Sequence, residues 1–159
     1  MNPGTSFPNN SKLLAPTAFR FVLNRELRHA MRQNGCLSLL VIETTRDLGG
    51  TQISADDETM HEIAQVLNDE MRDRDLLGYT DAGTLSLVLR STDYQRSMRV
   101  IDRLIARLER HRFSAPVQIA LGAACYPMHA MGAESLKRWA VSHLVASCHA
   151  DPPSSPDQN

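Results

Sequence analysis

The chain has 159 residues, with 17 Lys and Arg against 18 Asp and Glu, and 42% of its side chains are hydrophobic. This length fits a single domain with its own core, and the charge balance argues against a general nucleic-acid binder. No apolar run approaches the roughly 18–20 residues of a membrane-spanning helix. Because the N-terminus also lacks the charged and apolar regions of a signal peptide, we expect a cytoplasmic protein without membrane insertion.

The first half of the chain is expected to contain two helices and one buried strand. Apolar residues recur at three- and four-residue spacing over residues 16–34, which predicts an amphipathic helix that ends at Gly35. The continuous apolar run 36–42 is typical of a central strand that is buried on both faces. After a glycine-containing loop, Ser54 is expected to cap a second helix that continues to about Arg74.

The second half of the chain is expected to add a hairpin, two helices and a further strand. Residues 76–80 and 84–89 flank a turn of Asp, Ala and Gly, which predicts the hairpin. Apolar spacing predicts helices over residues 98–108 and 136–144, with a strand at 117–122 between them. This order predicts an α+β fold of ferredoxin-like or nucleotide-cyclase-like type, with a central mixed sheet flanked by helices.

Both ends of the chain differ in composition from the part between them. Residues 1–14 and 150–159 are polar and contain many Pro, Asn and Ser residues. Such segments bury too little apolar surface to fold, so we expect disordered ends around one domain at residues 15–149.

Local motifs predict neither a metal site nor a catalytic site. The 6 histidines are scattered, and none lies at zinc-site spacing from a cysteine. Cys36, Cys125 and Cys148 form no CxxC pair and are expected to be small hydrophobic residues. His143 is expected to pack in the core, because it lies on the apolar face of the last predicted helix.

An Arg-x-x-Asp pattern, Arg72 and Asp75, lies between the second helix and the hairpin. By itself the pattern predicts a solvated ion pair, which contributes only about 0–1 kcal/mol to stability. A second observation favours a ligand. Every basic residue except Lys12 and Lys137 is arginine, and the planar guanidinium suits phosphate and carboxylate groups.

Three longer segments carry a resemblance to a known family. They are the strand Leu37–Glu43, the strand and turn Leu87–Asp93, and the strand Ile119–Pro127. From about Phe19 to Leu144, the chain is similar to a GGDEF domain, the diguanylate cyclase family. The resemblance implies the nucleotide-cyclase-like fold and a function connected with cyclic di-GMP.

The same alignment shows where the chain departs from the family. The GGDEF signature falls on Asp-Ala-Gly-Thr-Leu at 81–85, so Gly83 replaces an acidic metal ligand. Glu43 matches the first metal-binding Asp and Asp57 the Asp that reads guanine, which implies a vestigial nucleotide site. The Lys that contacts phosphate is replaced by Cys148. Because magnesium-assisted phosphoryl transfer needs several oxygen ligands, the resemblance implies a degenerate, inactive cyclase with no metal or other cofactor.

One feature of the family is retained, namely the inhibitory site that binds the product. In the family an Arg-x-x-Asp lies five residues before the signature, as Arg72 and Asp75 do here, and an arginine of the next helix completes the site, as Arg103 does. The resemblance implies that the two arginines contact phosphate or guanine edges and that Asp75 accepts hydrogen bonds from a guanine. The expected ligand is cyclic di-GMP.

Three functions stay open at this point. The first is an inactive cyclic di-GMP receptor that signals to a protein partner in trans, and ligands stacked between two protein surfaces imply a homodimer. The second is a nucleotide-independent scaffold built on the same fold, and the third is an active cyclase with atypical ligands. For the receptor, Arg72→Ala and Asp75→Ala are expected to abolish nucleotide binding with little change in melting temperature.

Overall fold

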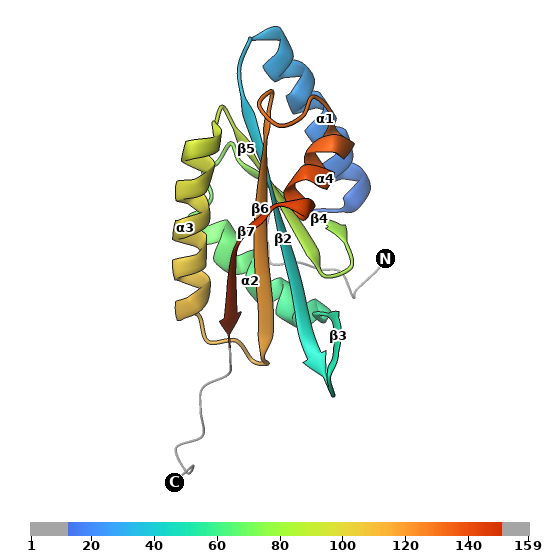
Figure 1. Cartoon of the computed structure of the whole chain (residues 1–159), viewed down its shortest axis with the longest axis vertical. Coiled ribbons are helices and arrows are strands. Elements are labelled where there is room, and N and C mark those ends of the chain that lie inside the picture. Colours follow the sequence, from blue (N-terminus) through green and yellow to red (C-terminus); the bar gives the residue numbers. More distant parts are fainter. Residues whose placement is uncertain (1–12, 151–159) are drawn as a thin grey trace.

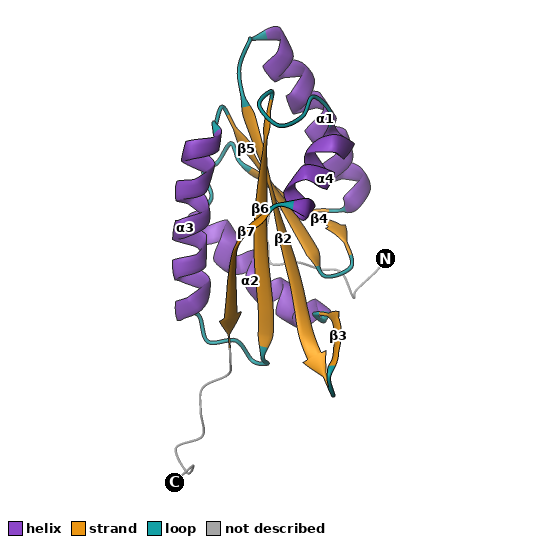
Figure 2. Cartoon of the chain, in the orientation of Figure 1, coloured by secondary structure: helices purple, strands orange, loops and turns teal. Residues whose placement is uncertain are grey.

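A seven-stranded mixed sheet forms the middle layer of the protein, and helices cover both of its faces (Figure 1, Figure 2). The computed structural model describes residues 13–150. The strands lie in the order β1-β4-β5-β2-β6-β7, and β3 pairs with β2 beside this path. The strands are β1 (Leu13–Leu14), β2 (Leu37–Leu48), β3 (Thr51–Ser54), β4 (Leu76–Asp81), β5 (Thr84–Arg90), β6 (Val117–Tyr126) and β7 (Leu144–Ala150). The helices are α1 (Pro16–Arg32), α2 (Asp57–Glu70), α3 (Tyr94–Arg110) and α4 (Ala133–Ser142).

The two faces of the sheet have separate cores. On β2, Leu40 and Ile42 pack with the cluster formed by α2 and α3, whereas Leu39 and Val41 pack with α1 and α4. Because successive side chains of a strand point to opposite faces, a strand covered on both sides must be apolar throughout. The structure confirms the α+β architecture and the central strand that the sequence predicts.

The strand β2 extends further than its apolar run. Beyond Ile42 it continues to Leu48, and residues 45–48 pair antiparallel with β3. The turn between them uses Gly49 and Gly50, whose φ angles of 61° and 91° lie in the left-handed region that glycine adopts readily. The sequence pattern does not predict this part of the strand, because Thr45, Arg46 and Asp47 are polar and the apolar Leu48 is exposed.

The start and end of α2 also differ from the sequence-based prediction. Asp56, and not Ser54, is the N-cap, because its carboxylate accepts a hydrogen bond of 2.8 Å from the backbone N–H of Thr59. Ser54 instead ends β3. The helix ends at Glu70 rather than near Arg74, so the Arg72–Asp75 segment has a turn conformation of its own.

The last predicted helix is only partly correct. α4 ends at Ser142, and residues 144–150 form β7, which pairs antiparallel with β6 at the edge of the sheet. The prediction that His143 is a core residue is wrong, because its ring is exposed and stacks on Trp139 with centroids 4.1 Å apart. Leu144 and Val145 satisfy helical and strand spacing equally, so tertiary pairing decides the outcome.

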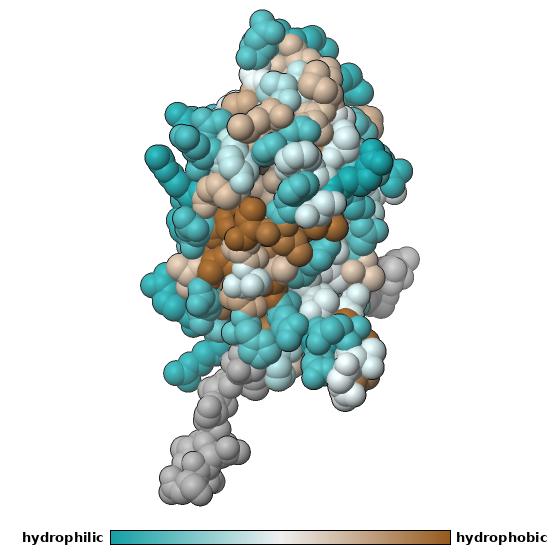
Figure 3. Space-filling view, viewed as in Figure 1, coloured by the Kyte–Doolittle hydropathy of each residue, from teal (hydrophilic) through white to brown (hydrophobic). Residues whose placement is uncertain are grey.

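An apolar patch lies on the surface where α4 meets β7. Val141, Leu144 and Val145 are exposed there, and Figure 3 shows apolar side chains gathered in the middle of this face. Among residues 13–150, no helix is long and apolar enough to cross a bilayer.

The sequence predicts that both ends of the chain are disordered. Residues 1–12 and 151–159, which make up most of these ends, lie outside the described residues. Leu13 and Leu14, which the sequence places in the N-terminal end, pair in parallel with Leu77 and Gly78 of β4. The sheet therefore begins before residue 15.

Candidate functional site

The residues Arg72–Asp75, which we call the arginine corner, form a closed turn between α2 and β4. The backbone N–H of Asp75 donates to the carbonyl of Arg72 at 3.0 Å, and the backbone N–H of Arg72 donates to Asp75 Oδ2 at 3.1 Å. The guanidinium adds two bonds to the same carboxylate, from Nε to Oδ2 at 3.3 Å and from Nη2 to Oδ1 at 3.2 Å. The side chain is therefore held in a fixed orientation.

The prediction of a solvated ion pair is wrong for one of the two partners. The Asp75 side chain is only 4% exposed, whereas that of Arg72 is 46% exposed. A buried carboxylate without donors is costly, so removing Arg72 leaves a penalty that an exposed pair would not produce. The expectation that Arg72→Ala barely changes the melting temperature must be revised for this reason.

The Arg72 guanidinium also ties the arginine corner to the end of β5. Its Nη2 atom donates to the carbonyl of Arg90 at 3.4 Å and to Thr92 Oγ1 at 3.1 Å. Thr92 is itself buried, and its carbonyl accepts a bond of 2.8 Å from Ser38 Oγ at the start of β2. Sequence reasoning did not include Thr92, because nothing in the local pattern indicates that these segments meet.

Arg103 of α3 reaches the same end of α2. Its Nε atom lies 3.1 Å from Glu70 Oε2, and its Nη2 atom donates to the Glu70 carbonyl at 3.4 Å. Arg107, one turn further along α3, pairs with the other oxygen of Glu70 at 2.9 Å. Because Glu70 is two residues before Arg72, the structure brings Arg72 and Arg103 to one end of α2, and the Arg103 side chain is 52% exposed.

The β4–β5 hairpin, residues 76–90, carries the segment that aligns with the GGDEF signature. Its turn at Ala82 and Gly83 confirms the predicted hairpin. The Gly83 carbonyl accepts two bonds of 2.8 Å from Thr44, one from the backbone N–H and one from Oγ1. On the outer side, Asp81 Oδ2 lies 2.6 Å from Lys137 Nζ of α4.

Gly83 has no room for a side chain. Its φ angle is 69°, and a Cβ atom there would lie 2.8 Å from the Thr44 carbonyl oxygen and 2.9 Å from Ser54 Cβ. Real Cβ atoms do not approach backbone atoms so closely, and the left-handed conformation disfavours side chains in addition. The position at which the resemblance expects an acidic metal ligand is therefore shaped for glycine.

The structure does not bring Glu43 and Asp57 together. Glu43 shares the face of β2 that packs against α1 and α4, and it lines an open groove with Gln118 and Ser147. Asp57 starts α2 on the opposite face, near Tyr79, and the pKa of this tyrosine is raised by burial and, secondarily, by the Asp57 charge. Within residues 13–150, no group of three or more His, Cys, Asp and Glu side chains is placed to hold a metal ion. The residues at the expected magnesium position do not fit the ion.

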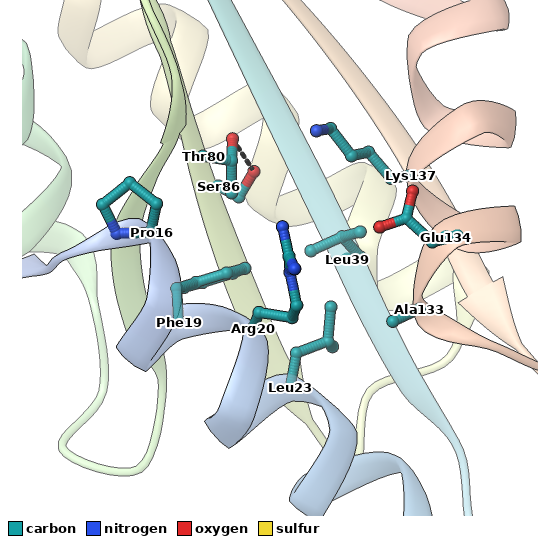
Figure 4. A pocket seen from close by; sticks show the side chains of 10 residues that line it. All are labelled: Pro16, Phe19, Arg20, Leu23, Leu39, Thr80, Ser86, Ala133, Glu134 and Lys137. Atoms are coloured by element: carbon teal, nitrogen blue, oxygen red, sulfur yellow. Dashed lines mark hydrogen bonds between the residues drawn. The ribbon is translucent and has the colours of Figure 1, made fainter.

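Beside the hairpin, a small cavity lies between α1, α4 and the sheet (Figure 4). Phe19, Leu23 and Leu39 form its apolar wall, with Arg20 and Lys137 near its mouth. Its volume of about 50 Å³ holds one or two water molecules but no nucleoside triphosphate.

Cys148, which aligns with the phosphate-contacting Lys of the family, lies on β7. Burial, with a smaller contribution from Glu109, raises the pKa of its thiol to about 11. The side chain is therefore a neutral thiol at pH 7 and offers no positive charge to a phosphate.

The sequence profile of the family described as "Diguanylate cyclase, GGDEF domain" matches residues 11–147. The chain belongs to the GGDEF domain family. No curated protein matches it in sequence. We call the β4–β5 hairpin, on which the resemblance places the GGDEF signature, the signature hairpin.

Solved structures show the same fold. The GGDEF domain of PA1120 (YfiN or TpbB) from Pseudomonas aeruginosa is 24% identical with a TM-score of 0.69, over 83% of this chain and 88% of that one. The GGDEF domain of DgcB from Caulobacter crescentus, solved in complex with c-di-GMP, is 12% identical with a TM-score of 0.70, over 89% and 86%. Diguanylate cyclase SiaD from Pseudomonas aeruginosa, solved with its activator SiaC, is 17% identical with a TM-score of 0.69, and the match covers 87% of this chain and 56% of SiaD.

Proposed function

We propose that this GGDEF domain is a catalytically inactive cytoplasmic receptor for cyclic di-GMP that passes its signal to a protein partner. The observation that carries the proposal is the pair of half-exposed arginines at one end of α2, each oriented by an acidic anchor. Asp75 anchors Arg72, and Glu70 anchors Arg103.

The chemistry of the ligand matches two oriented guanidinium groups. Cyclic di-GMP offers phosphodiester oxygens and the O6 and N7 acceptors of guanine, and a planar guanidinium binds either with two parallel hydrogen bonds. Asp75 is buried, and both of its oxygens already accept from Arg72. We therefore assign Asp75 to positioning Arg72 rather than to the direct guanine contact that the resemblance implied. Homodimerisation would place two such surfaces around stacked ligands.

The local geometry of the signature hairpin supports the absence of cyclase activity. Phosphoryl transfer with magnesium needs several oxygen ligands around the ion. Gly83 supplies no side-chain oxygen, and its contacts with Thr44 and Ser54 leave no space for a carboxylate. Glu43 lies on the other face of the sheet from Asp57, so the two do not replace the missing ligand set.

A scaffold that binds no nucleotide is the second candidate. The observation in its favour is that the Arg72 guanidinium already has hydrogen-bond acceptors within the chain, because it donates to Asp75, Arg90 and Thr92. The exposed apolar patch at Val141, Leu144 and Val145 would then be the functional surface.

Isothermal titration of the purified chain with cyclic di-GMP separates the two candidates, with GTP and magnesium as a parallel titrant. For the receptor, we expect micromolar or tighter binding of cyclic di-GMP that Arg72→Lys and Arg103→Ala each weaken at least about tenfold. Arg138→Ala is the matched control, because it removes an exposed arginine from α4 on the other face. Absence of heat with wild-type protein, or equal binding by all variants, would refute the receptor. Cyclic product formed from GTP would refute inactivity.

A further inference from the structure

A second cavity, of about 270 Å³, lies between the C-terminal half of α1, the start of β2 and the end of β5. It is distinct from the arginine corner and from the signature hairpin. About half of its wall is polar, and its volume is below that of pockets for drug-sized molecules. The polar side chains that line it are Glu26, His29, Gln33, Cys36, Arg90 and Ser91.

The cavity contains two opposite charges at close range. Glu26 of α1 is only 8% exposed, and Arg90 Nε lies 2.7 Å from its Oε1 atom. Arg25 Nε lies 3.7 Å from Oε2, which is beyond hydrogen-bonding distance. Glu26 Oε2 therefore retains capacity to accept from a ligand, and the partly exposed Arg90 guanidinium retains donors.

The charged side chains of the wall set the polarity of a ligand. The end of α1 contributes little, because the carbonyls of His29, Ala30 and Met31 accept from the backbone N–H groups of Gln33, Gly35 and Asn34. A cationic group of a ligand is favoured beside the Glu26 carboxylate, and an anionic group is favoured beside the Arg90 guanidinium.

The backbone around the cavity is held in an uncommon conformation. Within residues 13–150, Asn34 and Ser91 are the non-glycine residues with positive φ, at 50° and 52°. Ser91 lines the cavity, and Asn34 lies between two residues that line it. Asn34 directly follows the C-cap of α1, where a left-handed residue is an ordinary helix ending and Asn adopts it readily. Ser91 has no such explanation, and conformations of this kind concentrate at ligand sites.

We propose that this cavity binds a small zwitterion of amino-acid size. The ammonium group is held by the Glu26 carboxylate, and the carboxylate is held by the Arg90 guanidinium. The proposal does not depend on cyclic di-GMP binding. The Arg90 carbonyl accepts from Arg72, whereas its guanidinium pairs with Glu26. The two sites therefore share a backbone segment but no side chain.

Thermal-shift measurements with each free proteinogenic amino acid, followed by titration calorimetry of those that stabilise the chain, test this proposal. Acetate and methylammonium are the single-charge controls. At about a hundredfold excess over its Kd, a binding amino acid should raise the melting temperature by several degrees, and neither control should. Glu26→Gln and Arg90→Lys should each weaken binding at least about tenfold.

Two further variants make the result specific. Glu134→Gln, which neutralises an exposed carboxylate of α4, should bind the amino acid as wild type does. Arg72→Lys should also leave amino-acid binding unchanged, so failure of this proposal and failure of the receptor proposal give different results. The proposal is overturned if no amino acid binds the folded wild-type chain. It is also overturned if binding persists in Glu26→Gln and Arg90→Lys, with circular dichroism showing that both are folded.

Discussion

The arginine corner and the signature hairpin are neighbours in the chain, yet they present opposite kinds of surface. At the corner, the acidic partner Asp75 is buried and the Arg72 guanidinium reaches solvent. In the hairpin turn, the carbonyl of Gly83 faces inward to Thr44, and Gly83 itself is buried. The corner exposes the Arg72 guanidinium to solvent, whereas Gly83 in the hairpin turn makes its hydrogen bonds within the chain.

The contrast shows that one fold can orient an exposed charged side chain at one turn and exclude side chains at the next. An exposed arginine normally loses much side-chain entropy when it binds a ligand, and an anchoring carboxylate reduces that loss in advance. Asp75 and Glu70 supply such anchors. In the hairpin, Asp81 is paired with Lys137, and Gly83 makes backbone contacts that a side chain would prevent.

We expect the largest change in stability when a charged side chain is introduced into the hairpin turn. Gly83→Asp restores a carboxylate at the third signature position, but it places a Cβ atom 2.8 Å from the Thr44 carbonyl at a φ angle of 69°. We expect a loss of about 3 kcal/mol in the free energy of unfolding, from the left-handed backbone and the buried charge together. Urea denaturation measures it.

The control for this variant lies in the same turn. Ala82→Asp adds the same charge at an exposed position and should change stability by less than about 1 kcal/mol. We also expect no cyclic product from GTP with Gly83→Asp. If Gly83→Asp unfolds at the same urea concentration as wild type, the turn accommodates a side chain at position 83, and this prediction is wrong.

The next effect tests whether the arginine corner is more than a surface ion pair. Arg72→Ala leaves the buried Asp75 carboxylate with fewer donors, so we expect a loss of about 1–3 kcal/mol in unfolding free energy. Arg74→Ala removes an exposed arginine of the same segment and should change stability by less than about 0.5 kcal/mol. Chemical denaturation of both variants beside wild type gives the comparison. If Arg72→Ala and Arg74→Ala are equally stable, the Arg72–Asp75 pair contributes no more than an exposed ion pair.

The smallest effect concerns the opposite end of α2 from the arginine corner. The Thr59 backbone N–H donates to the Asp56 carboxylate and, as the largest cause, lowers the pKa of this group below its ordinary value of 3.8. A carboxylate with a lowered folded-state pKa stabilises the fold above its unfolded-state pKa, and the contribution disappears as the pH falls through the folded-state pKa. Asp56→Ala should therefore cost about 1 kcal/mol at pH 7 and less near pH 3.

Denaturation of wild type and Asp56→Ala at both pH values provides the measurement. Asp57→Ala is the control, because it removes a neighbouring carboxylate of the first turn that does not cap the helix. An equal cost of Asp56→Ala at both pH values would contradict the capping role.

Much of this fold could be predicted from pattern alone. The apolar run 36–42 and the alternation around the hairpin identify the middle of the sheet, because strands in the core must be apolar. The family follows from segments along these same strands, and the profile match over residues 11–147 confirms it. The positions of Arg72, Asp75 and Arg103 near one another also follow from the family resemblance.

The order of most elements, the central strand and the family could be predicted from the amino-acid sequence, because they depend on local spacing and on apolar content. Contacts between distant segments determine that Asp75 is buried while Arg72 is exposed, that residues 144–150 form an edge strand, and that His143 is exposed. They also determine that Gly83 packs against Thr44. Each of these outcomes depends on which distant segment lies beside the residue. Burial and strand pairing are properties of that neighbour, and no local pattern contains them.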